Sequence, residues 1–191
     1  MLIKEEVQDE ETFYSMARVY YIRNEYSLAE EALNNAIKQK VRTEKVWHLF
    51  GRIYTVQGKL VEAQQAYETA LSVAQESQDA LLYLRIGSIY LKLQRYEDAK
   101  NMYLQACKYW PCGITWLGVG ISYYRLDDLL HAEQSLNEAN IQNNLDPNVW
   151  AYLALVCARQ QRFEEAQKAL KESIKHGLND EELKNEIGVQ Q

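Results

Sequence analysis

The sequence predicts an all-α protein, a solenoid of five antiparallel helix pairs followed by one further helix, within a single domain over residues 1–191. Three observations support this class: a motif that recurs about every 34 residues, apolar residues spaced three and four apart, and a shortage of residues that break helices. The chain has only 2 prolines and 8 glycines in 191 residues, which leaves little room for linkers or low-complexity tracts.

The recurring motif is an alanine, followed four residues later by an aromatic residue or leucine, and three residues after that by a second small residue. Successive copies are 34, 36, 33 and 34 residues apart. Their first alanines are Ala29, Ala63, Ala99, Ala132 and Ala166. This register predicts repeats over approximately residues 10–43, 44–77, 80–113, 113–146 and 147–180.

Two further positions recur in the same register. Twelve residues before each motif alanine stands a small residue: Ala17, Gly51, Gly87, Gly120 or Ala154. Four residues earlier stands a ring: Phe13, Trp47, Tyr83, Trp116 or Trp150. We expect the small residues at close crossings of the two helices, since a larger side chain would push the axes apart. The rings are expected to fill the space between neighbouring pairs.

Each repeat is expected to hold two helices, because apolar residues recur three and four apart on both sides of a short polar turn. Gln57–Lys59 and Asp127–Asp128 are two examples of this turn. Pro111 and Pro147 both lie between repeats, where an interrupted helix does no harm.

Residues from about 180 to 189 predict one further helix after the fifth repeat. Asn179 or Asp180 can serve as its N-cap, and Leu183 and Ile187 lie at helical spacing beyond it. We expect this helix to cap the fifth repeat, since a solenoid needs a cover at its open end. A frayed tail is the alternative.

Composition argues against two classes of partner. A net charge of -6 does not suit a broad nucleic-acid surface, because phosphate binding requires clustered Lys and Arg. The apolar run Ile86–Leu91 is interrupted by Gly87 and Ser88 and is far too short to cross a bilayer. We therefore expect neither a nucleic-acid nor a membrane partner. The 3 cysteines fit a reducing compartment, so a cytoplasmic or cytoskeletal location is expected.

No group of residues predicts catalysis, a cofactor or a metal site. The three histidines, His48, His131 and His176, lie in different repeats without a second ligand at metal spacing. Cys107 and Cys112 form a C-x4-C pair, but no second pair exists, so we prefer to interpret them as core or surface filling. The sequence thus predicts a protein that is not an enzyme.

The repeated residues resemble the tetratricopeptide repeat (TPR) family over about residues 10–180. This resemblance implies a right-handed superhelix in which the first helix of every pair lines a concave groove, through its positions 2, 5, 9, 12 and 13. Transferred to this chain, the candidate partner-binding residues are Tyr14, Arg18, Tyr21, Lys45, His48, Arg52, Leu81, Leu84, Leu91, Lys92, Ile114, Leu117, Ile121, Tyr124, Arg125, Leu155 and Arg159.

This candidate groove has an apolar floor and basic edges. The floor runs from Leu81 to Leu155, and its edge carries Lys92, Arg125 and Arg159. A second basic cluster at the N-terminal end consists of Arg18, Lys45 and Arg52.

An apolar stripe of this length on an open face needs a cover. We expect an amphipathic helix or apolar segment with acidic flanks to bind there, supplied by a partner protein or by another part of the parent chain. The alternative is that facing helices of a tight superhelix cover the apolar floor themselves.

One known use of the TPR fold can be compared with these residues directly. Arrays that hold the C-terminal carboxylates of heat-shock proteins use Lys and Asn in a first repeat, Asn in a second, and Lys and Arg in a third. The matching residues here are Tyr14, Arg18, Leu49, Leu81 and Arg85. One repeat later they are His48, Arg52, Arg85, Ile114 and Gly118. We therefore expect no chaperone-tail carboxylate clamp.

Residues 110–158 also resemble the C-terminal TPR array of the axonemal family called cilia- and flagella-associated protein seventy. The stretches Trp116–Leu126, Leu136–Asn140 and Val149–Leu155 carry this likeness. It implies a structural component of the axoneme of motile cilia or flagella, associated with the outer dynein arms, and a longer parent protein. The alternative is a regulatory or targeting TPR domain of a larger enzyme or of a non-ciliary complex.

Overall fold

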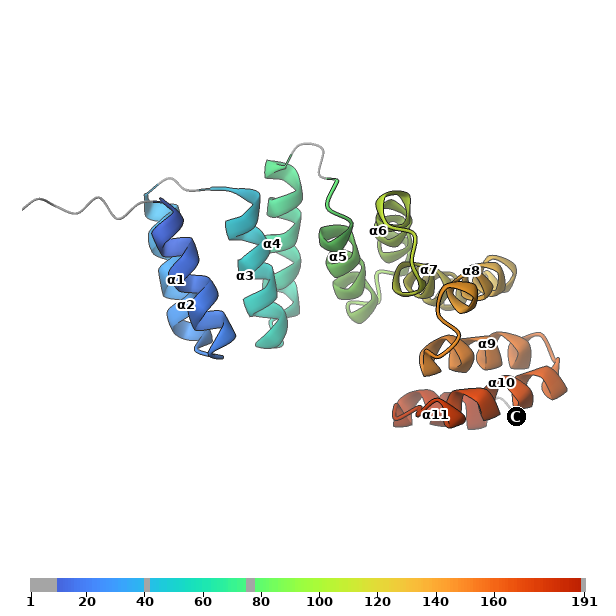
Figure 1. Cartoon of the computed structure of the whole chain (residues 1–191). Coiled ribbons are helices and arrows are strands. Elements are labelled where there is room, and N and C mark those ends of the chain that lie inside the picture. Colours follow the sequence, from blue (N-terminus) through green and yellow to red (C-terminus); the bar gives the residue numbers. More distant parts are fainter. Residues whose placement is uncertain (1–9, 40–41, 75–77, 190–191) are drawn as a thin grey trace, which may run out of the picture. The chain divides into compact units, whose positions relative to one another are not determined.

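The computed structural model describes residues 10–39, 42–74 and 78–189. Over these ranges the chain forms eleven α-helices and no β-strand, which confirms the all-α class (Figure 1). The helices group into two compact units, Met1–Gln78 and Asp79–Gln191. The single domain expected from the sequence stays a prediction.

The first unit contains two helix pairs. Its helices are α1 (Glu10–Ile22), α2 (Tyr26–Lys38), α3 (Glu44–Val56) and α4 (Leu60–Val73). Helix α1 packs against α2, α3 packs against α4, and α2 also contacts α3. Motif alanines such as Ala29 and Ala36 are fully buried beside Leu33, which is why these positions take small residues.

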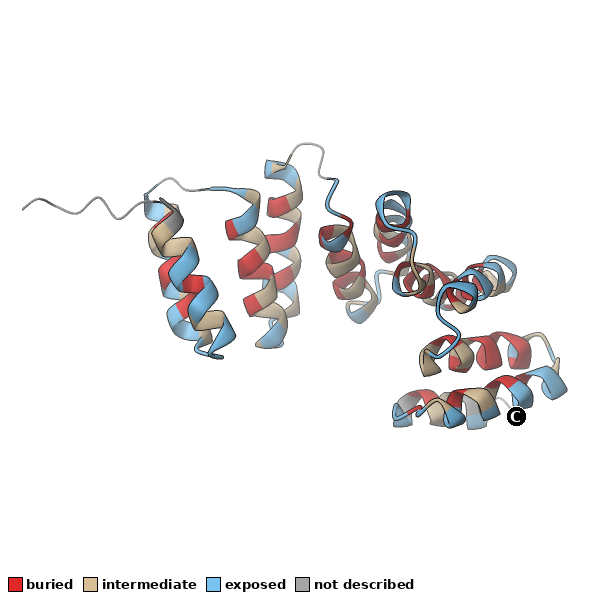
Figure 2. Ribbon diagram, viewed as in Figure 1, coloured by how far each residue is buried: buried red, intermediate tan, exposed pale blue. Residues whose placement is uncertain are grey.

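The second unit contains three helix pairs and a final helix. Its helices are α5 (Ala80–Lys92), α6 (Tyr96–Tyr109), α7 (Gly113–Arg125), α8 (Leu129–Gln142), α9 (Pro147–Arg159), α10 (Phe163–Lys175) and α11 (Glu181–Val189). Helices α6 and α8 each pack on their own first helix and on the first helix of the next pair, and α10 packs on α9. Buried residues lie along the facing sides of the helices (Figure 2).

Glycines permit the closest helix crossings, as the sequence predicted. A Cβ atom added at Gly51 would lie 2.5 Å from the ring of Tyr67 on the paired helix. At Gly120 an added Cβ would lie 2.6 Å from Leu136. Both distances are far below van der Waals contact, so only glycine fits while these helices keep their spacing.

The turn inside each helix pair has one conformation throughout. Three residues separate the two helices, and the middle one has positive φ: Asn24 (62°), Gly58 (74°), Gln94 (59°), Asp127 (63°) and Gln161 (62°). The next residue donates its N–H to a carbonyl five residues back, as Arg95 does to Tyr90 at 2.8 Å. This is the Schellman motif, which satisfies the carbonyls at the end of the first helix.

Gly58 allows a direct test of this turn. We expect Gly58→Ala to lower the free energy of unfolding of the first unit by about 1 kcal/mol, because a Cβ atom is unfavourable in the left-handed region. No atom lies within 4 Å of the added Cβ, so the backbone conformation alone causes the loss. Chemical denaturation measures it. Gly58→Asn should cost less, since asparagine tolerates this conformation, and equal losses for the two variants would contradict the explanation.

Candidate protein-binding surface

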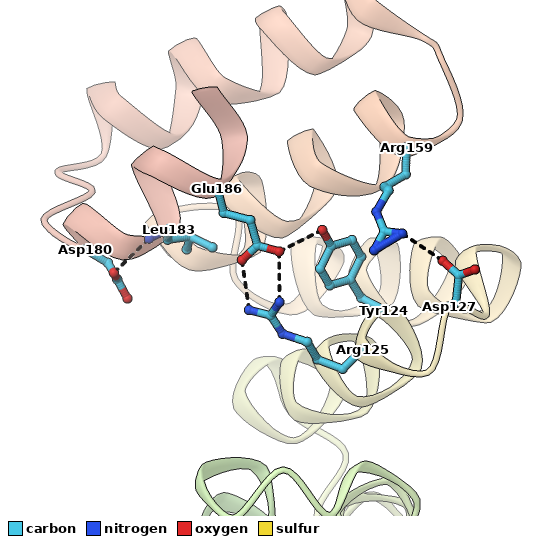
Figure 3. A network of polar contacts seen from close by, with 7 residues as sticks. All are labelled: Tyr124, Arg125, Asp127, Arg159, Asp180, Leu183 and Glu186. Atoms are coloured by element: carbon cyan, nitrogen blue, oxygen red, sulfur yellow. Dashed lines mark hydrogen bonds and ion pairs between the residues drawn. The ribbon is translucent and has the colours of Figure 1, made fainter. Parts of the chain in front are cut away.

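The first helices of successive pairs in the second unit contact one another, α5 with α7 and α7 with α9, and so form one continuous layer. This layer corresponds to the predicted groove. A network of polar contacts lies on this layer (Figure 3). It includes residues at the C-terminal ends of α7 and α9, namely Tyr124, Arg125 and Arg159.

This site holds a carboxylate of α11. Arg125 donates from Nη1 to Oε1 of Glu186 at 2.8 Å and from Nη2 to Oε2 at 2.9 Å, a two-point pairing (Figure 3). The Tyr124 hydroxyl donates to the same Oε1 at 2.9 Å. Such bidentate, charge-assisted bonds are stronger and more directional than bonds between neutral groups.

Electrostatics around Arg125 reinforce this pairing. Partial burial acts to lower the pKa of Arg125, but the hydrogen bonds that Arg125 donates to Glu186 and its interaction with the nearby Tyr152 outweigh burial and raise the pKa. The guanidinium groups of Arg125 and Arg159 both lie 5.4 Å from the centre of the Tyr124 ring. Arg159 also pairs with Asp127 at 3.0 Å. Both arginines at this end of the layer are therefore already neutralised within the chain.

Helix α11 lies on the layer of first helices. Asp180 caps it by accepting the N–H of Leu183 at 3.0 Å, as one of the two predicted N-caps. Among the described residues, α11 makes its main helix contact with α9. A first helix would instead pack on the second helix before it, as α7 packs on α6 and α9 packs on α8. Leu178 and Leu183 are buried in the same core as Val149. Helix α11 therefore covers part of the predicted groove; its role as an end cap stays a prediction.

Three predicted groove residues lie in the core of the second unit. Leu117, Tyr124 and Leu155 have exposed fractions of 9%, 1% and 0%. The expectation that their side chains line an open floor needs correction, because all three belong to a buried core cluster that also contains residues of α8, α9 and α11. At these three positions the alternative applies: the fold itself covers the floor.

The other predicted residues of the second unit differ in exposure. Leu81 and Ile114 are 39% and 55% exposed, and Lys92 is exposed as well. Leu84, Leu91 and Ile121 are half-buried. The exposed residues of the apolar floor are therefore Leu81 and Ile114, at the N-terminal ends of α5 and α7.

The first unit brings its predicted residues together differently, as cations beside rings. The guanidinium of Arg52 lies 4.4 Å from the ring centre of Tyr21, and that of Arg18 lies 5.9 Å from that of Tyr14. His48 packs 5.7 Å from Tyr67. These distances are typical of cation–π and ring contacts on a helix face.

The cations of this first-unit face are not neutralised within the described part of the chain. Arg18 and Lys45 are exposed, and neither they nor Arg52 pair with a carboxylate among those residues. The Nε atom of Arg52 is buried and has no hydrogen-bond partner there. The two units thus differ: the second holds an acidic side chain against its arginines, and the first leaves its basic residues open to a ligand.

The cysteines and histidines take structural positions. Burial raises the pKa of the Cys107 and Cys157 thiols, which disfavours the nucleophilic thiolate. His131 bonds through Nδ1 to Asp128 at 2.8 Å, close to its own helix terminus. No group of three potential metal ligands occurs in the residues that the structure describes. Nor does any helix in that part of the chain have the length and apolar character needed to span a membrane.

Glu186 and Asp127 are the site residues that the sequence did not identify. The available signal was the spacing between Leu183 and Glu186, which places an apolar and an acidic residue on one helical face. That spacing alone does not say which surface the helix covers, because the position of α11 depends on long-range packing against α7 and α9.

Comparison with known proteins reveals related chains. The family described as "Cilia and flagella-associated protein 70 C-terminal domain" matches residues 40–190. The human cilia- and flagella-associated protein 70 is 42% identical over 178 residues, which cover 93% of this chain and 16% of that protein. Its counterpart from Macaca fascicularis is 50% identical over 122 residues, or 63% of this chain and 12% of the relative. The chain thus spans only a small part of these relatives.

Solved structures of low sequence identity share the fold. YrrB, described as "a TPR protein with an unusual peptide-binding site", superposes with a TM-score of 0.81 at 19% identity, covering 95% of this chain and 92% of YrrB. MamA from Desulfovibrio magneticus RS-1 gives a TM-score of 0.81 at 12% identity, covering 87% of this chain and 94% of MamA. These structures confirm the predicted TPR solenoid and, at such identities, speak for the fold alone.

Proposed function

Because the chain belongs to the family of the cilia and flagella-associated protein 70 C-terminal domain, as its sequence resemblance predicted, we propose that it is a non-enzymatic protein-binding scaffold of the cilium or flagellum. Within that organelle the proposed site of action is the axoneme, in association with the outer dynein arms. The relatives' names and the peptide-binding site in the description of YrrB support this assignment.

The partner that we propose is a protein segment with acidic side chains. The supporting observation is the face of the first unit formed by Tyr14, Arg18, Tyr21, Lys45 and Arg52, called here the basic–aromatic face. Its cations are not neutralised within the described residues, and rings lie beside two of them. Such a surface favours carboxylates next to apolar groups, through paired charges and cation–π contacts.

Charge reversal on this face tests the proposal. We expect the double variant Arg18→Glu with Lys45→Glu to bind axonemal proteins in amounts at least about tenfold lower than the unaltered chain does. The reason is that the new negative charges repel an acidic partner. The measurement uses the immobilised chain, a salt extract of axonemes and quantitative mass spectrometry. Both side chains are exposed, so circular dichroism should show an unchanged fold.

The matched control is Arg23→Glu with Lys38→Glu, which makes the same charge change at exposed residues outside the face. This control should retain the same axonemal proteins as the unaltered chain. Equal loss in both double variants would indicate a general charge effect. Full retention by the Arg18 and Lys45 variant would exclude the basic–aromatic face as the partner site.

A further inference from the structure

Helix α11 has features of an exchangeable ligand. It has only nine residues, and an isolated helix of that length is not stable in water, so its order depends on contact with the rest of the unit. Among its described side chains only Leu183 is buried. A short helix at the edge of a packed unit opens locally at a lower free energy than the core around it.

The contacts of α11 define what the surface beneath it recognises. Leu183 enters the core, and Glu186, three residues later on the same face, meets Arg125 and Tyr124 (Figure 3). The other charged residues around this point are already engaged, since Arg159 pairs with Asp127. Among the described side chains of α11, one apolar anchor and one carboxylate thus meet this surface, and they lie three residues apart on one helical face.

We propose that the surface of α7 and α9 is a helix-binding site with α11 as its resident ligand, and that a partner helix bearing an apolar residue followed three residues later by a carboxylate replaces α11. This inference deepens the proposed scaffold function, on which it rests, by defining the partner class for the second unit. The apparent affinity for the partner is then the intrinsic affinity multiplied by the fraction of chains in which α11 is undocked. The resident helix also keeps Arg125 paired and the apolar anchor site covered until a partner is present.

The test uses the full 191-residue chain and a fluorescein-labelled peptide of residues 178–191 as the probe. Fluorescence anisotropy should show weak binding to the unaltered chain, because its own α11 competes. The Glu186→Lys chain should bind the same peptide about tenfold more tightly or better, since its α11 now places a lysine against Arg125 and leaves the site.

Charge exchange establishes which contact is responsible. The Arg125→Glu chain should not bind the unaltered peptide, but should bind a peptide that carries Glu186→Lys. The matched control is the Glu181→Lys chain, because Glu181 is 76% exposed at its side chain and pairs with Lys184 of its own helix rather than with α7 or α9 among the described residues. This control should behave as the unaltered chain does.

Hydrogen exchange of the α11 amides provides a second measurement on the same samples. Exchange should be about tenfold faster or more in the Glu186→Lys chain, and the double variant Arg125→Glu with Glu186→Lys should restore the original rate. Protection that is unchanged by Glu186→Lys, together with no peptide binding to any variant, would show that α11 is a fixed part of the core. If the unaltered chain forms a dimer and the Arg125→Glu chain does not, the ligand is α11 of a second copy of the chain. That result would overturn the proposal of a separate partner.

These measurements need no ciliary material. If the peptide exchanges but the chain retains no axonemal proteins, the helix-binding site is supported and the proposed scaffold function is contradicted. If the chain retains axonemal proteins but the peptide does not exchange, the scaffold function is supported and the helix-binding site is contradicted.

Discussion

Gly118→Ala is expected to destabilise the second unit by about 3 kcal/mol, the largest effect of any single methyl group added to this chain. An added Cβ would lie 2.3 Å from the ring of Tyr103. The ring cannot simply retreat, because an added Cβ at Gly87 would meet its opposite edge at 2.9 Å. Tyr103 is thus held between the backbones of α5 and α7, and denaturant unfolding followed by circular dichroism measures the loss.

Gly188→Ala is the matched control, since it adds the same methyl group to a helical glycine with no atom within 4 Å of the new Cβ. It should leave stability unchanged or raise it slightly, because alanine favours helix. Replacing Tyr103 by leucine in the Gly118→Ala background should recover part of the loss. A Gly118→Ala variant as stable as the Gly188→Ala variant would contradict the described packing of Tyr103.

Leu155→Ala is expected to lower the free energy of unfolding of the second unit by about 3 kcal/mol. The side chain is fully buried, so its truncation loses buried apolar surface and leaves a cavity in the core cluster that also contains Leu117 and Tyr124. Leu81→Ala, a matched change at a residue that is 39% exposed, should cost about 1 kcal/mol or less. Thermal and denaturant unfolding of the two variants measure the difference.

This pair of variants also separates core from surface among the predicted groove residues. If Leu155→Ala is as stable as Leu81→Ala, Leu155 faces an open groove, and the correction made for the floor is wrong. If the large difference appears, Leu155 belongs to the core, and a partner has access to the exposed floor residues Leu81 and Ile114.

The fold could be predicted from the sequence because its determinants are local. Residues such as Gly51 and Gly120 recur at a fixed distance from the motif alanines, and each meets a large side chain of the paired helix. Helix periodicity and this register specify an all-α repeat without any knowledge of long-range contacts. The positive φ of Gln94 and Gln161 was not predicted, because glutamine carries no signal for the left-handed region.

The binding surface could be predicted only in part, because exposure depends on what lies opposite. Arg125 and Arg159 were identified as groove cations, but their carboxylate partners were not. Leu117 and Leu155 occupy helix positions that face the groove in the family, yet neighbouring helices cover them here. Sequence spacing gives the face of a helix on which a residue lies, but not whether another element covers that face.

The uniform three-residue turn determines where the chain can change length. An inserted residue in that turn would rotate the following helix by about 100°, which would move its alanines away from the paired helix. The first helix has 13 residues in every pair, and the second has 13 or 14. The variation of the repeat between 33 and 36 residues therefore falls almost entirely on the connections between pairs. Insertions and deletions accumulated during evolution should concentrate in these connections, where they alter the spacing of pairs without disturbing the packing inside them.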